Sequence, residues 1–286
     1  MNFPSITISV PATSANLGPG FDSFGLALGL ANKVTVKKEG NSKKLPSIME
    51  EVATLFFSTT KISSFPFSVN IAGDVPSARG LGSSVTVRLG ILLALNELTQ
   101  HPLTSTNLYH LAASLEGHAD NTAPALLGGF TIARNNREPV RYEVAQELRF
   151  ILLIPDFEVS TDSARKLLPT TTSITDAAAN GANAAVIATA FATGKYQLLR
   201  GSFQDRLHQP FREPLVPFLS EALTAAESVG ALGGWLSGSG STIAVIAEGE
   251  TIAQRVVSAF QQIAPGGSQL LITKADNEGA KPLRGV

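Results

Sequence analysis

PSARGLGSSVT, residues 76–86, is the stretch of this chain that says most about its fold. Just before it, apolar and polar residues alternate over 67–71, which is typical of a half-buried strand. Just after it, apolar residues recur at helical spacing over 85–93. We therefore predict a strand, a glycine-rich loop and a helix, in that order.

The loop has the composition of an anion-binding turn. Gly80 and Gly82 lack a Cβ, so the backbone N–H groups can approach a ligand closely. Ser83 and Ser84 add hydroxyls at the expected start of a helix, where free N–H groups and the helix dipole favour negative charge. No Gly-Lys-Ser/Thr follows, which excludes a Walker loop. A plain strand-to-helix turn fits the same residues, so both interpretations stay open.

Two more segments are rich in glycine: PATSANLGPGFDSFG at 11–25 and LSGSGST at 236–242. The second would suit any hairpin turn. In the first, Asp22 lies between the apolar Phe21 and Phe24, and an aspartate is rarely buried without a partner. A cation on a ligand and a capped loop would each explain Asp22.

Composition excludes several classes of protein. The 286 residues carry a formal net charge of -1, so the basic stripe of a nucleic-acid binder is absent. There is no cysteine, which excludes disulfides and thiol nucleophiles, and the four histidines show no metal-site spacing. The N-terminus does not resemble a secretory signal, and the apolar run 89–95 is too short to cross a bilayer. We expect a cytoplasmic protein that binds neither membrane nor nucleic acid.

The remaining elements follow from the same apolar patterns. Beyond those already named, we predict strands at 6–10, 32–38, 127–134, 149–155 and 269–274, a strand on each side of the turn 237–241, and helices at 108–115 (with Ser105 as N-cap), 176–193, 196–207, 217–229 and 251–263. A polar turn is expected at 135–139 and a loosely held tail after Asp276. Without its extra helices, the second half reads β-α-β-β-α-β, the ferredoxin-like order.

Taken together, in this order and spacing, the three glycine-rich segments resemble the three motifs of the GHMP kinases. The stretches 11–28 and EGHADNTAPALLGG at 116–129 resemble most closely the homoserine kinase family within them. The resemblance implies an α+β, two-domain GHMP kinase fold. An N-terminal ATP-binding domain like ribosomal protein S5 domain 2 would cover residues 1–147, and a ferredoxin-like C-terminal domain would cover 148–286, with the active site between them.

The resemblance also implies an activity: phosphorylation of L-homoserine by ATP to O-phospho-L-homoserine, in threonine biosynthesis. Several relatives have an aspartate at the position of Asn121. An asparagine cannot accept a proton, so in-line transfer without a side-chain base is implied. A GHMP kinase for another small amino-acid-like alcohol, or a non-catalytic ligand-binding relative, are the alternatives. Dimers are common in the family, so a homodimer is compatible with it.

On the nucleotide side, the resemblance assigns the catalytic and metal-binding roles to Ser84 and Glu116, with Mg²⁺ as the cofactor and Asn121 as a further catalytic residue. Relatives differ in where the glutamate lies, and at the more distant placement this chain has His110. The residues expected to bind ATP are Pro76, Ser77, Ala78, Arg79, Gly80, Leu81, Gly82, Ser83, Ser84, Val85 and Thr86, with Gly238, Ser239 and Gly240 as the third motif. Val85 and Thr86 should narrow the space near the phosphates, and Arg88 would face either solvent or the nucleotide.

On the substrate side, the resemblance assigns the ammonium group to Asp22 and the carboxylate to Arg165 and Arg212. A guanidinium binds a carboxylate through a two-pronged fork, which suits this role. The substrate-binding residues implied are Asn16, Asp22, His118, Asn121, Thr161, Arg165 and Arg212. Asp120 is expected to support the loop rather than to act as a base.

Overall fold

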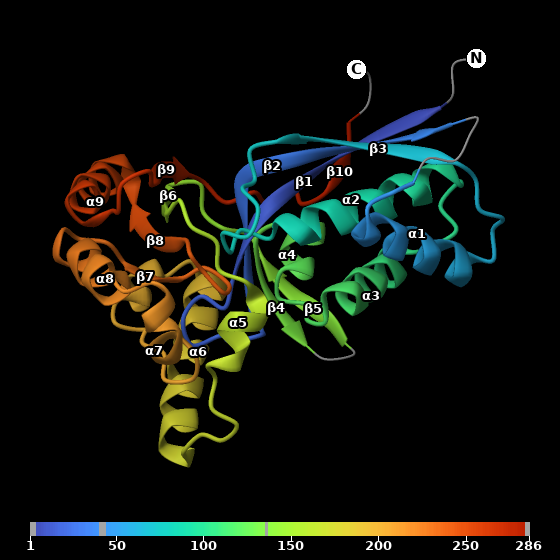
Figure 1. Cartoon of the computed structure of the whole chain (residues 1–286). Helices are drawn as coiled ribbons and strands as arrows, with labels where there is room; N and C mark the ends of the chain where they lie inside the picture. The colour runs from blue at the N-terminus through green and yellow to red at the C-terminus, as the bar shows by residue number, and fades with distance from the viewer. Residues whose placement is uncertain (1–3, 40–43, 135–136, 284–286) are drawn as a thin grey trace.

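The computed structural model describes residues 4–39, 44–134 and 137–283. Its strands form two antiparallel sheets (Figure 1). The first has the order β10-β1-β2-β4-β5, with β3 also paired to β2. Its strands are β1 (Ser5–Ala15), β2 (Phe24–Lys38), β3 (Phe67–Gly73), β4 (Phe130–Arg134), β5 (Arg137–Tyr142) and β10 (Lys281–Pro282). The second has the order β7-β8-β6-β9 and consists of β6 (Leu148–Ile154), β7 (Gly233–Leu236), β8 (Ile243–Glu248) and β9 (Gln269–Thr273).

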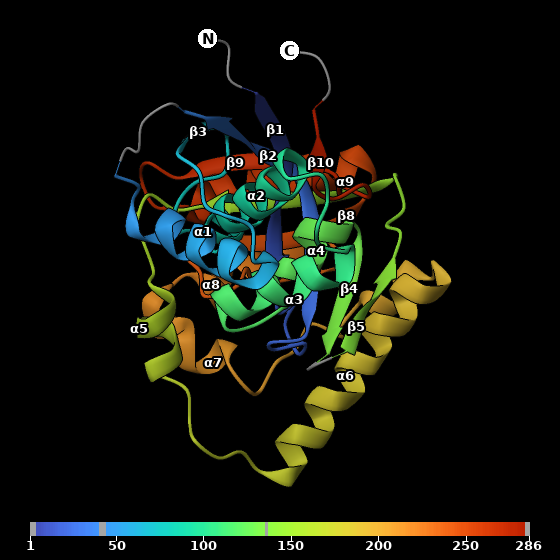
Figure 2. The ribbon, with the colours of Figure 1, turned by 90° about the vertical axis from the view of Figure 1, so that its right-hand side faces the viewer.

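Helices cover the first sheet on one side. Figure 2 shows them grouped in front of it: α1 (Ser47–Thr60), α2 (Ser83–Leu98), α3 (Ser105–Glu116) and α4 (Thr122–Leu127). The α2 side chains Leu89 and Leu92 pack with Val10 and Val34 of the sheet in one buried cluster. This apolar face holds the N-terminal end of α2 in place, and the loop 76–82 leads into that end.

The second sheet is covered by α8 (Leu219–Ser228) and α9 (Gly249–Ile263), while α5 (Thr161–Lys166), α6 (Ile174–Thr193) and α7 (Gln209–Arg212) lie between β6 and β7 in the chain. A buried cluster joins the two sheets, because Phe24 and Phe130 of the first pack with Phe150 and Trp235 of the second. The two halves therefore share an apolar core.

The strand order β7-β8-β6-β9 is the antiparallel ferredoxin-like arrangement predicted for the second half, and the predicted α+β, two-domain fold is confirmed. The division at 147/148 stays a prediction. The segment after Asp276 leaves the second sheet, and β10 pairs with β1 in the first. No helix among the described residues is long and apolar enough to cross a membrane.

Several expected elements were wrong. The helix expected at 196–207 is only a 3₁₀ turn at Tyr196–Leu199, because Gly201, with φ +73°, departs from the helical path. Beyond it, the Asp205 carboxylate accepts hydrogen bonds from the backbone N–H groups of residues 207–209 and holds them in a separate turn. The described part of the tail after Asp276 is held in place: Asn277 bonds the backbone of Val144 through both ends of its amide. The N-cap of α3 is Thr104, not Ser105.

Six elements were missed: helices α1, α4, α5 and α7 and strands β5 and β10. Strand β5 occupies most of the expected turn. Residues 135–136 of that turn lie outside the described residues. The signal for α4 is weak because its six residues span fewer than two turns.

Candidate active site

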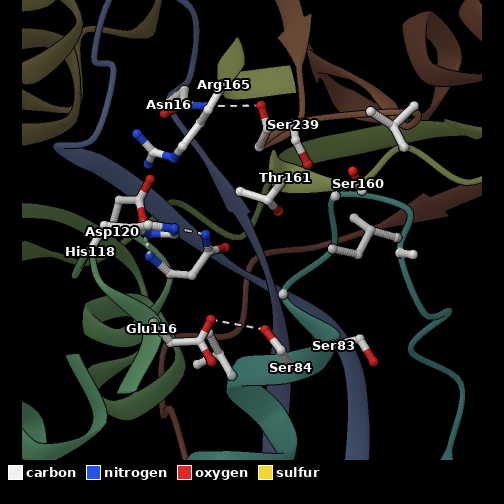
Figure 3. Close-up of a pocket in the computed structure, with 18 of the residues that line it drawn as sticks. Asn16, Ser83, Ser84, Glu116, His118, Asp120, Ser160, Thr161, Arg165 and Ser239 are labelled. Carbon is white, nitrogen blue, oxygen red and sulfur yellow. Dashed lines mark hydrogen bonds and ion pairs between the residues drawn. The ribbon is translucent and has the colours of Figure 1, made fainter. Parts of the chain in front are cut away.

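A cavity of about 410 Å³ opens beside the N-terminal end of α2, where the two halves of the chain meet (Figure 3). All seven residues predicted to bind the substrate line it: Asn16, Asp22, His118, Asn121, Thr161, Arg165 and Arg212. From the predicted ATP loop it takes Ala78, Gly80, Leu81, Gly82, Ser83, Ser84 and Val85, and from the third motif Gly238 and Ser239. Glu116 lines it as well, whereas Pro76, Ser77, Arg79, Thr86 and Gly240 are not among its lining residues.

The three glycine-rich segments meet at one edge of this cavity. The Ser237 hydroxyl donates to the Gly80 carbonyl at 2.6 Å, and the Gly238 N–H donates to the Ala15 carbonyl at 3.2 Å. Gly80 has φ +73°, and a Cβ there would lie 2.1 Å from the Ser237 carbonyl oxygen. The loop therefore requires glycine both for its conformation and for its contact with the third segment.

Helix α2 begins at the cavity wall. Its N-cap, Gly82, is in the left-handed conformation, and no side chain caps the free N–H groups of the first turn. Ser83 and Ser84 stand at that end with their side chains beside the cavity. Free N–H groups, hydroxyls and the positive end of the helix dipole make this a fitting place for phosphate.

Thr86 does not narrow this space, contrary to expectation. Its side chain is fully buried, where its hydroxyl donates to the Ser83 carbonyl and accepts from the Asn32 amide. Those two bonds turn Thr86 into the core between α2 and β2. Val85, by contrast, does line the cavity.

The side-chain oxygens of Glu116 and Ser84 lie together at the same end of the cavity. The Ser84 hydroxyl donates to one carboxylate oxygen of Glu116 at 2.9 Å, and Arg88 binds the other at 2.7 Å. Magnesium in nucleotide sites takes one or two protein oxygens and completes its shell with phosphates and water. The donor set at Ser84 and Glu116 fits that need, and the described residues form no larger cluster of metal ligands.

At the other end of the cavity, Asp22 and Arg165 form a two-pronged ion pair, with N–O distances of 2.7 and 3.1 Å. Asp22 is in the left-handed conformation, at φ +52°. The Asn16 amide holds this turn, because its oxygen accepts from the Asp22 N–H and its nitrogen donates to the Gly238 carbonyl. Asn16 thus fixes the position of Asp22 and ties the first motif to the third.

Arg212 is a buried cation at the same end, with 2 % of its surface exposed. Its hydrogen-bond partners are the Gly238 carbonyl at 3.0 Å and the His208 ring at 3.3 Å. Among the described residues no carboxylate forms a salt bridge with it, and its Nε has no partner. Burial, followed by the charge of Arg165, lowers the pKa of Arg212 to about 10, which leaves it charged at neutral pH. An anion in the cavity would meet a cation that lacks a counterion.

Between these two ends lie His118 and Asp120 (Figure 3). The His118 Nδ1 lies 2.6 Å from the Asp120 carboxylate, and this hydrogen bond raises the pKa of His118. Asp120 also accepts from the Asn121 backbone N–H at 2.9 Å, which supports the loop as expected. The Asn121 side-chain oxygen accepts from the Thr13 hydroxyl at 2.7 Å, and its amide nitrogen donates to the Asp120 carboxylate at 3.4 Å. An amide NH₂ has two N–H groups, so one remains for the cavity.

Comparison with known proteins agrees with this geometry. The GHMP kinases N terminal domain matches residues 47–129, and the GHMP kinases C terminal domain matches 188–265. Homoserine kinase of Clostridium beijerinckii is 37% identical over 98% of this chain and 99% of its own length. That of Aquifex aeolicus is 36% identical over 96% of this chain and 99% of its own. This chain belongs to the homoserine kinase family of the GHMP kinases.

Solved structures lead to the same family. The crystal structure of homoserine kinase from Cytophaga hutchinsonii matches with a TM-score of 0.89, at 26% identity over 98% of this chain and 97% of that one. A mevalonate kinase structure matches with a TM-score of 0.70 at 14% identity, which shows the shared fold alone.

Several site residues of this homoserine kinase family member were not predicted from the sequence. Phe21 lies under both arginines, with its ring centroid 5.6 Å from the Arg165 guanidinium and 5.3 Å from that of Arg212. Thr13 orients the Asn121 amide from within a strand. The cavity is also lined by Phe21, Arg88, Asp120, Val159, Ser160 and Asp162. Phe21 adjoins Asp22 in the first motif, but no sequence pattern indicates which way its ring points.

Proposed function

We propose that this protein transfers the γ-phosphate of ATP to the hydroxyl of L-homoserine and releases O-phospho-L-homoserine, as a step of threonine biosynthesis in the cytoplasm. The observation that carries the proposal is that one cavity has two ends of different chemistry. One end offers a helix N-terminus with two serines, and the other offers Asp22 between two arginines. A ligand with an ammonium and a carboxylate matches the second end, and a triphosphate matches the first.

Arg212 gives the second end its preference for an anion. It is buried, charged and without a carboxylate partner among the described residues. A substrate carboxylate would supply that partner, while Arg165 would share it across the Phe21 ring. Sugars and other uncharged alcohols would leave the Arg212 guanidinium without a negatively charged partner, so an amino acid is the better match.

Asn121 positions the attacking hydroxyl in this proposal. Its NH₂ donates to the hydroxyl oxygen, because its own oxygen is engaged by Thr13. Phosphoryl transfer has a loose transition state that asks for alignment and charge stabilisation more than for early proton removal. The α2 N–H groups and the Ser84 hydroxyl would stabilise charge on the phosphate oxygens. Ser84 and Glu116 would hold magnesium, which neutralises phosphate charge when bound.

The test is ADP release with MgATP and a panel of alcohols that holds L-homoserine, D-homoserine, L-serine, L-threonine, mevalonate and galactose. We expect turnover of L-homoserine. In Arg212→Ala, loss of a buried charged contact of about 2 to 5 kcal/mol should lower kcat/KM at least about 30-fold. Asn121→Ala should lower kcat about a hundredfold.

Arg206→Ala is the matched control, since Arg206 pairs with Asp176 and is not among the lining residues of the cavity. It should turn over substrate as the wild type does. Turnover confined to another amino-acid alcohol would move the assignment to that substrate. Silence on every alcohol, with ATP still bound, would indicate a non-catalytic relative.

A further inference from the structure

Arg88 is the cationic side chain of the phosphate end. It stands one turn after Ser84 on α2, so both side chains lie on the same face of the helix. Its side chain is 18% exposed and lines the cavity. The other arginines of the lining, Arg165 and Arg212, belong to the end where Asp22 and Phe21 lie.

Two carboxylates hold Arg88. One nitrogen lies 2.7 Å from Glu116, whose side chain is 8% exposed, and another lies 3.2 Å from Glu51 of α1, which is 54% exposed. Its third nitrogen, Nε, is buried and has no hydrogen-bond partner among the residues that the structure describes. Three helices are thus linked through one guanidinium, and the stronger contact is with the carboxylate proposed for magnesium.

The consequence is a matter of charge. A carboxylate already paired with a guanidinium at 2.7 Å attracts a second cation less, because the two positive charges would lie within a few ångströms of each other in a partly buried site. The same guanidinium favours a polyanion placed beside Ser84. We infer that Arg88 is a specificity-determining residue of the proposed kinase reaction: it neutralises Glu116, so that the site binds metal poorly on its own and accepts it together with nucleotide phosphates.

This inference rests on the proposed function only for the identity of the nucleotide, and its test needs no homoserine. Binding of Mn²⁺ alone and of ATP in EDTA is measured by titration calorimetry. In Arg88→Met we expect Mn²⁺ to bind about tenfold more tightly and metal-free ATP about tenfold more weakly than in the wild type. A structural role alone would not move the two affinities in opposite directions.

Arg149→Met is the matched control, because Arg149 forms a similar pair with Glu250 at 2.9 Å, is 19% exposed and lies on β6 outside the cavity lining. It should change neither affinity. Arg88→Lys keeps the charge and should stay within about threefold of the wild type for both ligands.

Glu51→Gln should act in the opposite direction to Arg88→Met, with weaker Mn²⁺ and tighter ATP binding, because Arg88 then faces Glu116 alone. Thermal unfolding shows whether each variant is folded. If Arg88→Met is not folded, the affinities of Glu51→Gln and Arg88→Lys test the inference instead. The inference would be overturned if Arg88→Met bound both ligands as the wild type does. It would also be overturned if Arg88→Met bound Mn²⁺ more weakly than the wild type. If the expected changes in Mn²⁺ and ATP affinity are found but the wild type does not turn over homoserine, only the proposed substrate is contradicted.

Discussion

In the proposed function, Asp22 and Arg165 select the ligand that binds at their end of the cavity. They bind each other at 2.7 Å, so a ligand that takes one of them must separate the pair. A zwitterion can offer an ammonium to Asp22 and a carboxylate to Arg165, and so replaces each lost contact. A ligand with a single charge leaves one partner uncompensated, which is costly in a partly buried site.

Asp22→Asn tests this exchange. We expect KM for L-homoserine to rise about tenfold or more, because the ammonium loses its counterion. We also expect 4-hydroxybutyrate, which has the carboxylate but no ammonium, to inhibit the variant more strongly than the wild type, because Arg165 is then free. Equal inhibition of both proteins by 4-hydroxybutyrate would contradict the exchange.

His118 gives a prediction about pH. Its hydrogen bond to Asp120 raises its pKa above the usual value near 6.5. The extra stability belongs to the protonated form, so it is fully present below about pH 6.5 and is lost as the pH rises through the folded-state pKa. The difference in free energy of unfolding between the wild type and His118→Gln is measured by urea denaturation. It should therefore be larger at pH 5.5 than at pH 8.5. The same difference at both pH values would argue against a charged His118–Asp120 pair.

At the scale of elements, the loop 76–82 and α2 act as one unit. The loop is held on the far side of the cavity as well, because Arg79 donates from Nε to the Pro155 carbonyl and the Val159 N–H donates to the Ala78 carbonyl. Contacts from both halves of the chain therefore fix the loop before α2 begins. A ligand that reaches the α2 N-terminus meets a preformed backbone, which lowers the entropy lost on binding.

Gly80→Ala should disrupt this unit. A Cβ at Gly80 would lie 2.1 Å from the Ser237 carbonyl, in addition to the strain of its φ of +73°. Gly194 has nearly the same φ, +69°, but no atom of the described part of the chain lies within 4 Å of the Cβ that Gly194→Ala adds. That variant therefore carries only the backbone strain, about 1 to 2 kcal/mol. We expect Gly80→Ala to weaken ATP binding about tenfold beyond any change in Gly194→Ala. Equal ATP affinities in the two variants would show that the contact with Ser237 is unimportant.

What the sequence could predict differs between elements for physical reasons. Helix α9 and strand β6 carry a strong apolar pattern, so their existence was predicted correctly, whereas the almost equally long α1 was missed. The turn at 200–208 was mistaken for a helix because its conformation depends on Asp205, whose carboxylate replaces helical bonds. Cavity residues that lie in recognisable motifs could be named, whereas Thr13 and Arg88 could not be assigned partners, because those partners are more than 25 residues away.

At the scale of the whole molecule, the shared cluster between the sheets explains how residues from both halves reach one cavity. Phe24 and Phe150 pack in that cluster, and Asp22 lies two residues before Phe24 in the first motif. The second half contributes Arg165 and Arg212 from the chain between β6 and β7. Mutual burial of the two sheets fixes the distance between Asp22 and these arginines, so the ion pair depends on the whole fold rather than on either half.

Strand β10 has a consequence for how the protein is made. Lys281 and Pro282 pair with Ser9 and Ile8, and the Leu283 N–H donates to the Thr7 carbonyl, so residues 281–283 cover the outer edge of β1. During synthesis that edge stays open until these residues have left the ribosome, long after β1 itself. Until then β1 offers unpaired backbone groups to other chains, and pairing with β10 removes that opportunity.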